Sequence, residues 1–260
     1  MVFSSILFLF SFLPVVLFLY MISPFSLKNG ILLVASLFFY AWGEPIYILL
    51  MLFSIFVDYF AGILIGKYRG TSPIKAKLAL LFSICTNIAI LSFYKYADLL
   101  IETLNDWVGT NFSPLNLPLP IGISFYTFQT MSYSIDVYRG EVLPQKNWFT
   151  FATYVSLFPQ LIAGPIVRYK LVAKDLEYRR WDWDFFTEGI KVFLIGLGKK
   201  VLLANNIGIL WDEAKQIPFD ELSTSQAWLG ICAFSFQIYF DFSGYSDMAK
   251  GLGKMFGFHF

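Results

Sequence analysis

Histidine and cysteine are almost absent from this 260-residue sequence, which contains one histidine and two cysteines. The histidine, His259, stands next to the last residue, and Cys85 and Cys232 lie in two separate apolar segments. Zinc sites combine several His and Cys ligands, and catalytic triads place a histidine beside a nucleophile. The sequence therefore predicts neither a metal site nor a triad. The two cysteines are predicted to be buried thiols rather than a disulfide.

Charged residues are also scarce, at 14% of the chain, whereas soluble domains carry about 25%. Hydrophobic residues make up 57% and aromatic residues 20%, a composition that predicts a membrane protein. The net charge of +1 lacks the basic footprint of a nucleic-acid-binding protein. We therefore expect no nucleic acid partner, and we predict that the chain is embedded in the lipid bilayer.

Six apolar runs predict membrane helices, because about twenty residues at roughly 1.5 Å per residue cross a bilayer. One of them is short, and we expect residues around Glu44 to complete it. The runs are Val2–Ile22, Ile31–Trp42, Ile46–Ile65, Leu78–Tyr94, Phe186–Trp211 and Trp228–Phe242.

The basic residues between these runs predict an orientation. Lys28 and the loop Lys67–Lys77 are separated by two runs, so they lie on the same side of the membrane, and the positive-inside rule makes that side cytoplasmic. The N-terminus and Glu44 are then extracytoplasmic. Asp58, late in its run, is predicted to lie near the inner surface.

Two segments in the middle of the chain are not typical of simple spans. Ile121–Gly140 follows three prolines and carries many polar residues, which favours a buried or re-entrant helix. Phe149–Ile166 is apolar, but basic residues flank it on both sides, and Pro159 and the pair Gly164-Pro165 can break a helix. We predict a re-entrant hairpin that enters and leaves on the cytoplasmic side.

The last two runs contain charged residues. Gln237 and Asp241 are four residues apart and share a helix face, and Gly244 offers a place for the helix to bend or stop. A carboxylate at bilayer depth costs at least about 2.5 kcal/mol, so it normally faces a protein interior or a wet cavity. Asp241 could instead lie near the surface and anchor the helix. Likewise, Lys199 and Lys200 either extend to the inner face or line a cavity and meet Asp241 or another carboxylate.

Several phrases of the sequence resemble the membrane-bound O-acyltransferase family, in its bacterial alginate O-acetyltransferase and teichoic-acid D-alanyl-transfer branch. Together they extend over essentially the whole chain, and they are specific only in combination. The phrases are Val2–Pro14 (VFSSILFLFSFLP), Phe38–Gly43 (FFYAWG), Leu119–Gln129 (LPIGISFYTFQ), Tyr133–Gly140 (YSIDVYRG), Phe158–Tyr169 (FPQLIAGPIVRY) and Gln237–Ala249 (QIYFDFSGYSDMA).

The resemblance implies an all-α, polytopic protein of the bacterial inner membrane, with transmembrane and re-entrant helices around a tunnel. It implies no bound cofactor. An acyl donor, acetyl-CoA or another acyl carrier, would be the co-substrate, and an extracytoplasmic polysaccharide such as alginate the acceptor. Members of this branch often act with a soluble partner protein. Helix-breaking prolines and polar residues at bilayer depth agree with a water-accessible tunnel.

The catalytic motif of the family, a histidine in an Arg-Trp-His-type sequence, does not occur in this chain. We therefore expect residues 1–260 to form a single membrane domain, the N-terminal part of an acyltransferase, which lacks the downstream catalytic region and is inactive alone. His259 is a second-rank candidate for the general base, because a chain terminus positions a base poorly.

Eight polar residues are the candidates for the tunnel or for substrate binding. Arg168 is the candidate for a donor phosphate, because a guanidinium presents a bidentate fork. For every candidate, hydrogen bonding between helices is the alternative role. The sequence also leaves open a transporter or channel with Lys199, Lys200 and Asp241 as its charged pathway, or a non-catalytic scaffold. The eight are Gln129, Asp136, Gln160, Arg168, Lys199, Gln237, Asp241 and Asp247.

Overall fold

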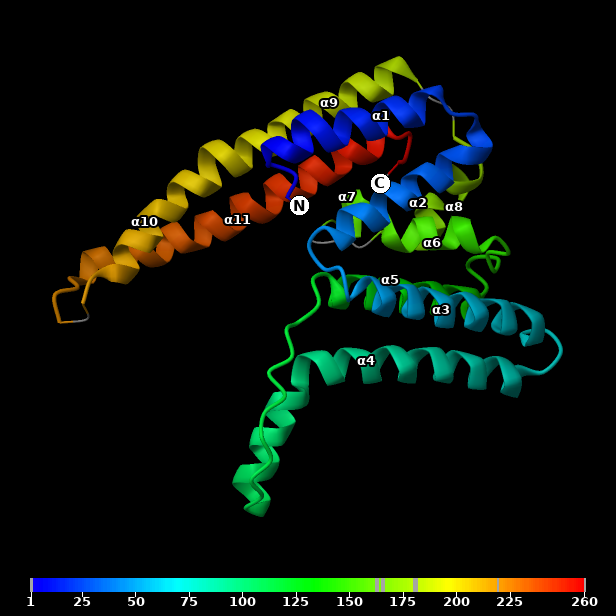
Figure 1. Cartoon of the computed structure of the whole chain (residues 1–260), viewed down its shortest axis with the longest axis horizontal. Helices are drawn as coiled ribbons and strands as arrows, with labels where there is room; N and C mark the ends of the chain where they lie inside the picture. The colour runs from blue at the N-terminus through cyan, green and yellow to red at the C-terminus, as the bar shows by residue number, and fades with distance from the viewer. Residues whose placement is uncertain (1, 162–163, 165–166, 180–181, 219, 260) are drawn as a thin grey trace. The chain divides into compact units, whose positions relative to one another are not determined.

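The computed structural model describes residues 2–161, 164, 167–179, 182–218 and 220–259. Within these residues the chain forms helices joined by turns and loops, without a strand (Figure 1). They form two compact units. The first, called the bundle unit, is built mainly from residues 23–161 and 167–178. The second, the hairpin unit, is built mainly from residues 2–22, 179, 182–218 and 220–259.

Three helices pack against one another at the centre of the bundle unit: α3 (Ile48–Tyr68), α4 (Pro73–Val108) and α5 (Ile123–Arg139). The helices α3 and α4 are antiparallel and joined by a short turn (Figure 1). As expected, α5 begins only after the last of the prolines, and one face of it is buried. The remaining helices are α2 (Phe25–Ala41), α6 (Trp148–Ser156), α7 (Phe158–Leu161) and α8 (Tyr169–Glu177).

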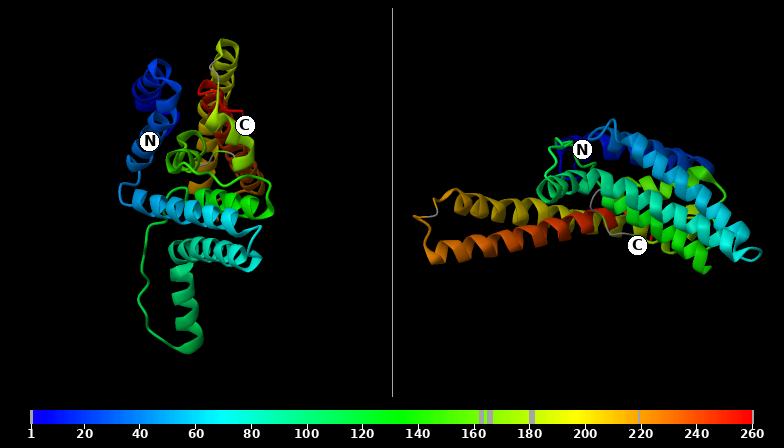
Figure 2. Two further views of the ribbon diagram at one scale, coloured as in Figure 1. Left: turned by 90° about the vertical axis from the view of Figure 1, so that its right-hand side faces the viewer. Right: turned by 90° about the horizontal axis from the view of Figure 1, so that it is seen from below.

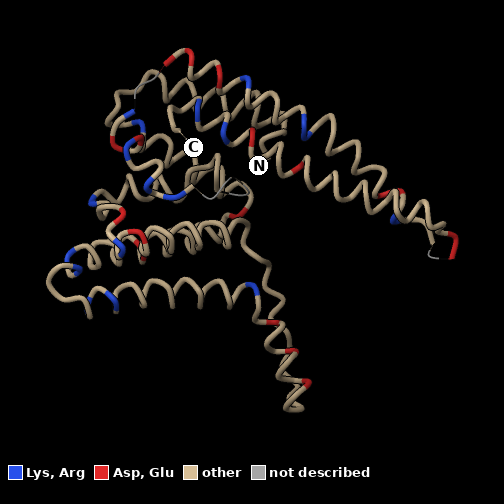
Figure 3. Tube along the Cα trace, turned by 180° about the vertical axis from the view of Figure 1, so that it is seen from behind, with Lys and Arg blue, Asp and Glu red and all other residues tan. Residues whose placement is uncertain are grey.

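The helix α4 has 36 residues, which at roughly 1.5 Å per residue is longer than a bilayer core of about 30 Å. Its C-terminal part changes direction and projects from the bundle unit (Figure 1). The loop that follows runs back beside this projection, where Asp98 accepts hydrogen bonds from the backbone N–H groups of Leu115 (2.6 Å) and Asn116 (3.0 Å). Figure 3 shows basic residues around the α3–α4 turn and acidic residues along the projecting part of α4.

The hairpin unit contains two long antiparallel helical segments, which lie side by side in Figures 1 and 2. One is continuous through α9 (Trp183–Gly198), a π-helical stretch (Lys199–Ala204) and α10 (Asn205–Gln216). The other is α11 (Thr224–Met255), which begins with a capping box between Ser223 and Gln226.

Glycines bring the two segments of the hairpin unit into close contact. A Cβ at Gly196 would lie 2.5 Å from the carbonyl oxygen of Gly244, and a Cβ at Gly251 would lie 2.7 Å from that of Gly189. The helix does not stop at Gly244, since α11 continues to Met255. Gly244 instead lets two helix backbones approach closely, as small residues do between membrane helices.

At its N-terminus the hairpin unit contains a short π-helix (Phe8–Phe12) followed by α1 (Leu13–Ile22). The Tyr20 hydroxyl of α1 donates to the carbonyl oxygen of Phe256 at 2.6 Å, and Arg179 Nε donates to the same hydroxyl at 2.7 Å. These bonds join α1 to the end of α11.

Three described helical segments are long and apolar enough to cross a membrane: Ile48–Tyr68, Pro73–Val108 and Trp183–Gln216. The segments Phe8–Ile22 and Phe25–Ala41 are shorter apolar helices. Residues Phe25–Gly30 extend the second predicted run, so the prediction that residues around Glu44 would do so is wrong. Cys85 and Cys232 are free but exposed on their helices, which corrects the prediction of buried thiols.

The segments α6 and α7 have nine and four residues, too short for either to cross a bilayer. The helix α6 ends at Ser156 and α7 begins at Phe158, so the break between them falls at Leu157, two residues before Pro159. The second break expected in this stretch involves Pro165, which lies outside the described residues. The re-entrant path through the membrane stays a prediction.

Candidate functional site

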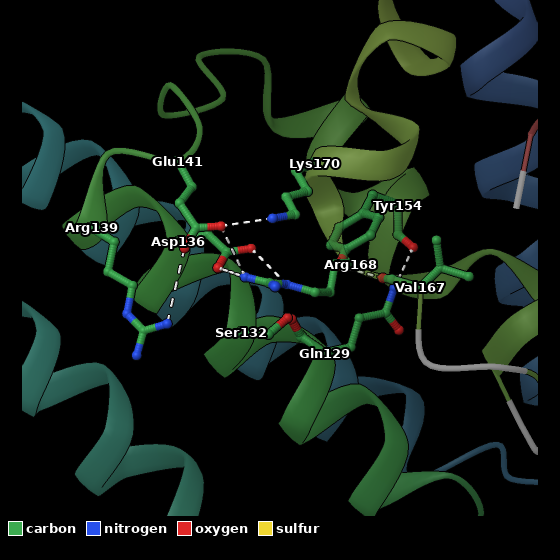
Figure 4. A network of polar contacts seen from close by, with 9 residues as sticks. All are labelled: Gln129, Ser132, Asp136, Arg139, Glu141, Tyr154, Val167, Arg168 and Lys170. Atoms are coloured by element: carbon green, nitrogen blue, oxygen red, sulfur yellow. Dashed lines mark hydrogen bonds and ion pairs between the residues drawn. The ribbon is translucent and has the colours of Figure 1, made fainter.

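Asp136 and Arg168 form an ion pair in the bundle unit (Figure 4). Asp136 is in the last turn of α5 and is 1% exposed, whereas Arg168 is the residue before α8, with a side chain 40% exposed. The contact is bidentate: Arg168 Nη2 donates to Asp136 Oδ1, and Arg168 Nε donates to Asp136 Oδ2 at 3.2 Å. The hydrogen bonds and charge of Asp136 raise the pKa of Arg168 above its ordinary value. The guanidinium is therefore oriented by one fork while part of it stays accessible.

Glu141 extends this pair into a charge network. It accepts hydrogen bonds from Lys170 Nζ at 2.8 Å and from Arg168 Nη2 at 3.2 Å, and Arg139 lies 4.0 Å away. The hydrogen bond from Lys170, followed by the neighbouring positive charges, lowers the pKa of Glu141. Three basic side chains thus face two carboxylates, and this end of α5 carries an excess of positive charge.

Two predicted residues, Gln129 and Gln160, form no hydrogen bond with Arg168 among the described residues but belong to a hydrogen-bond network next to it. Both side-chain amides donate to the backbone carbonyl oxygen of Tyr154, at 3.0 Å and 2.7 Å. The Tyr154 hydroxyl in turn donates to the carbonyl oxygen of Val167 at 2.9 Å (Figure 4). Val167 precedes Arg168 in the chain, so this buried set of bonds positions the backbone that carries the guanidinium. The sequence did not single out Tyr154.

The other four predicted residues lie in the hairpin unit. Lys199 Nζ lies 2.6 Å from Asp247 Oδ2 and donates to Ser243 Oγ at 3.0 Å, and Lys200 Nζ lies 2.6 Å from Asp241 Oδ1. Both lysines therefore meet carboxylates, as one of the alternatives predicted. Whether they line a cavity or extend to the inner face stays a prediction. Gln237 packs against Gly208, and its buried Oε1 has no hydrogen-bond partner among the described residues.

His259 follows the end of α11 and is exposed. Its ring stacks on that of Phe185, with 4.5 Å between the ring centroids. Nearby, Lys254 Nζ lies 5.6 Å from the centroid of Phe185 and is paired with Glu188. This environment gives the imidazole no buried position from which to act as a base.

A further polar cluster, around Asp58, was not among the predicted sites. Asp58 has ten residues of α3 on either side and is fully buried, so it lies at the middle of this helix. Its position near the inner surface of the membrane stays a prediction. Its carboxylate accepts hydrogen bonds from Ser83 Oγ, from Asn87 Nδ2 at 2.7 Å and from Ser134 Oγ at 3.1 Å. The signal is present in the sequence as pairs of polar residues four apart in three helices: Ser54 and Asp58, Ser83 and Asn87, Thr130 and Ser134.

Several known proteins are similar to this chain, although no family model matches its sequence. A probable alginate O-acetylase of Pseudomonas aeruginosa is 42% identical over 266 residues, which cover 100% of this chain and 50% of the relative. A peptidoglycan O-acetyltransferase of Helicobacter pylori is 35% identical, covering 98% of this chain and 54% of the relative. A teichoic acid D-alanyltransferase of Lacticaseibacillus rhamnosus is 28% identical over 53% of this chain. The chain spans about half the length of the first two relatives.

Proposed function

Because the chain belongs to the membrane-bound O-acyltransferase family, we propose that it is part of an enzyme that transfers acetyl groups to hydroxyls of a cell-envelope polysaccharide. The observation that carries this proposal is the similarity, over essentially the whole chain, to an alginate O-acetylase and a peptidoglycan O-acetyltransferase. An extracytoplasmic polymer such as alginate is the proposed acceptor. The transporter and scaffold alternatives are not favoured, since none of the relatives described above is named as either.

In the proposed reaction, the acceptor hydroxyl oxygen attacks the carbonyl carbon of an acetyl thioester, such as acetyl-CoA or another acyl carrier. The hydroxyl proton passes to a general base, and the thiolate leaves. Since a base must lie within hydrogen-bond distance of that hydroxyl, the exposed His259 is a poor candidate. We place the base in the part of the full-length enzyme that this chain does not span. A soluble partner protein would act on the extracytoplasmic side.

Arg168 is the residue we propose for the phosphate of the donor. Its guanidinium is oriented by Asp136 and remains 40% exposed, with Lys170 sharing Glu141 beside it. A planar, oriented guanidinium is suited to bidentate binding of phosphate.

The end of the bundle unit that carries Arg168 also supports this role. Arg69 Nη2 donates to the carbonyl oxygen of Arg139 at 3.0 Å, so this end of α5 lies at the basic turn between α3 and α4. The positive-inside rule makes that turn cytoplasmic, which is where a cytoplasmic donor would arrive. The proposed location is the bacterial inner membrane, with the N-terminus extracytoplasmic.

The experiment is a substitution in the full-length protein, expressed in a strain whose own polysaccharide O-acetylation gene is deleted. Arg168→Lys keeps the positive charge beside Asp136 but loses the planar fork. We expect KM for the acyl donor to rise about tenfold, which corresponds to about 1.4 kcal/mol, while kcat falls less. Arg139→Lys is the matched control, because this side chain is 65% exposed and lies 4.0 Å from the same Glu141.

Two outcomes separate the parts of the proposal. If the unaltered protein leaves the polysaccharide without O-acetyl groups, the proposed function fails. If it acetylates the polymer and Arg168→Lys leaves the KM for the donor unchanged, only the role of Arg168 fails.

A further inference from the structure

The cluster around Asp58 holds a buried carboxyl group without a basic partner among the described residues. Asp58 is 0% exposed in an apolar helix, and among the described residues no Lys, Arg or His forms an ion pair with it. The hydroxyls and the amide that donate to it supply dipoles but no charge. A buried, unpaired carboxylate is strongly unfavourable, so such groups are paired, protonated or bound to a cation.

Two further oxygens of the cluster are unsatisfied. Ser54 Oγ and Asn87 Oδ1 are buried, with each residue 1% exposed, and neither has a hydrogen-bond partner among the described residues. Asn87 directs its Nδ2 to Asp58 and to the carbonyl oxygen of Ser83 (3.0 Å), which leaves Oδ1 as an acceptor without a donor. Buried acceptors of this kind are rare and require an explanation.

The two oxygens lie at one level of the helix pair. Ser54 is one turn before Asp58 on α3, and Asn87 is one turn after Ser83 on α4. Since α3 and α4 are antiparallel and Ser83 bonds Asp58, both displacements point to the same end of the pair. Asn87 is thus bonded to the carboxylate from α4, and Ser54 lies one turn from the carboxylate on the same face of α3.

We propose that this cluster binds a small alkali cation, for which sodium is the probe. The ligands would be the Asp58 carboxylate, Asn87 Oδ1 and Ser54 Oγ, with the hydroxyls of Ser83 and Ser134 beside them. Hard cations take carboxylate, carbonyl and hydroxyl oxygens. A single carboxylate balances one positive charge, which favours a monovalent ion over calcium or magnesium. The ion would join α3, α4 and α5, and this inference does not rest on the proposed acyltransfer.

The test is thermal unfolding of the full-length protein in detergent, with sodium chloride replacing choline chloride at constant ionic strength. A ligand that binds only the folded state raises Tm in a saturable way, and we expect a rise of roughly 3–6 °C. Asp58→Asn should remove this dependence. Asp212→Asn, which removes an exposed carboxylate on α10, should retain it.

Ser54→Ala keeps the proposal testable if Asp58→Asn does not fold. Ser54 Oγ makes no hydrogen bond among the described residues, so a purely structural role predicts no change in the response to sodium. Loss of a ligand predicts a several-fold higher sodium concentration at half-maximal effect. Equal Tm in sodium and choline for the unaltered protein would overturn the proposal, and so would a Tm that depends on pH but not on sodium, which indicates a proton in place of the ion.

Discussion

The carboxylates of the hairpin unit that pair with Lys199 and Lys200 are partly exposed, whereas two carboxylates of the bundle unit are almost completely buried. Side chains in the pairs of Lys199 with Asp247 and Lys200 with Asp241 are between 22% and 47% exposed. Asp136 and Asp58 are 1% and 0% exposed. In these pairs of the hairpin unit each lysine meets a carboxylate on the facing helix.

This difference separates two uses of charge in an apolar protein. Partly exposed pairs contribute little stability, so their main effect is to specify how two helices meet. A buried carboxylate, in contrast, is strongly destabilising unless one particular group compensates its charge, so the stability of the fold around it depends on that group. That group is Arg168 for Asp136 and, in our proposal, a bound cation for Asp58.

The largest effect is expected when the compensating group of Asp136 is removed. Arg168→Met leaves the carboxylate buried and unpaired, which we expect to cost about 3 kcal/mol, the lower end of the range for buried pairs. Asp136→Asn should cost less than about 1 kcal/mol, because Arg168 is partly exposed and remains hydrated. Thermal unfolding in detergent measures both.

The double variant Asp136→Asn with Arg168→Met provides the control for this asymmetry. We expect it to recover part of the stability lost in Arg168→Met alone, since no buried charge remains. Equal losses in the two single variants would show that burial of Asp136 does not govern the pair.

A smaller effect on stability is expected for the pairs of the hairpin unit. Asp241→Asn removes a carboxylate that is 47% exposed, so the free energy of unfolding should change by less than about 1 kcal/mol. If Asp241 shapes the proposed tunnel, acetyl transfer should nevertheless fall about tenfold, because small displacements in a site reduce rates strongly. Near-normal transfer in a stably expressed variant would remove Asp241 from the mechanism, and Lys200→Ala tests the same pair from its other side.

The smallest expected effect concerns Glu141, an exposed carboxylate whose folded-state pKa lies below its ordinary value of 4.5. A lowered pKa means that the folded state favours the ionised form. This contribution to stability is therefore present above about the ordinary pKa and disappears as the pH falls through the lowered value. Glu141→Gln should lower Tm slightly at neutral pH and not at acidic pH. A Tm difference that stays constant across this range would contradict the assigned cause.

Much of the architecture was evident from local patterns. The low charge content and the apolar runs indicated an all-helical membrane protein, and the run Ile46–Ile65 corresponds closely to α3. The prediction that the prolines before residue 121 prevent an earlier start of α5 is confirmed, since this helix begins at Ile123. Helix ends were predicted less well: Phe25–Gly30 is helical although it contains Lys28 and Gly30, and α11 continues past Gly244. Packing against neighbouring helices overrides these local signals.

The candidate residues were largely identified by residue type, and pairing of Lys200 with Asp241 was one of the alternatives, but the groupings in the bundle unit were not predicted. Arg168 stood out as a guanidinium in a phrase that resembles the family, while its partner Asp136 is 32 positions earlier in the chain. Asp58 was considered only within its own run, so the sequence analysis did not identify it as part of a cluster. Only the meeting of α3 with α4 and α5 reveals that Ser83, Asn87 and Ser134 surround it.

The amino-acid sequence by itself determined the class of the protein, its family and the periodicity of its helices, because composition and spacing act within a single segment. The tertiary structure decided which charges are paired, which are exposed and which stay uncompensated. Those properties depend on contacts between residues far apart in the chain, where burial sets the free energy of each charge.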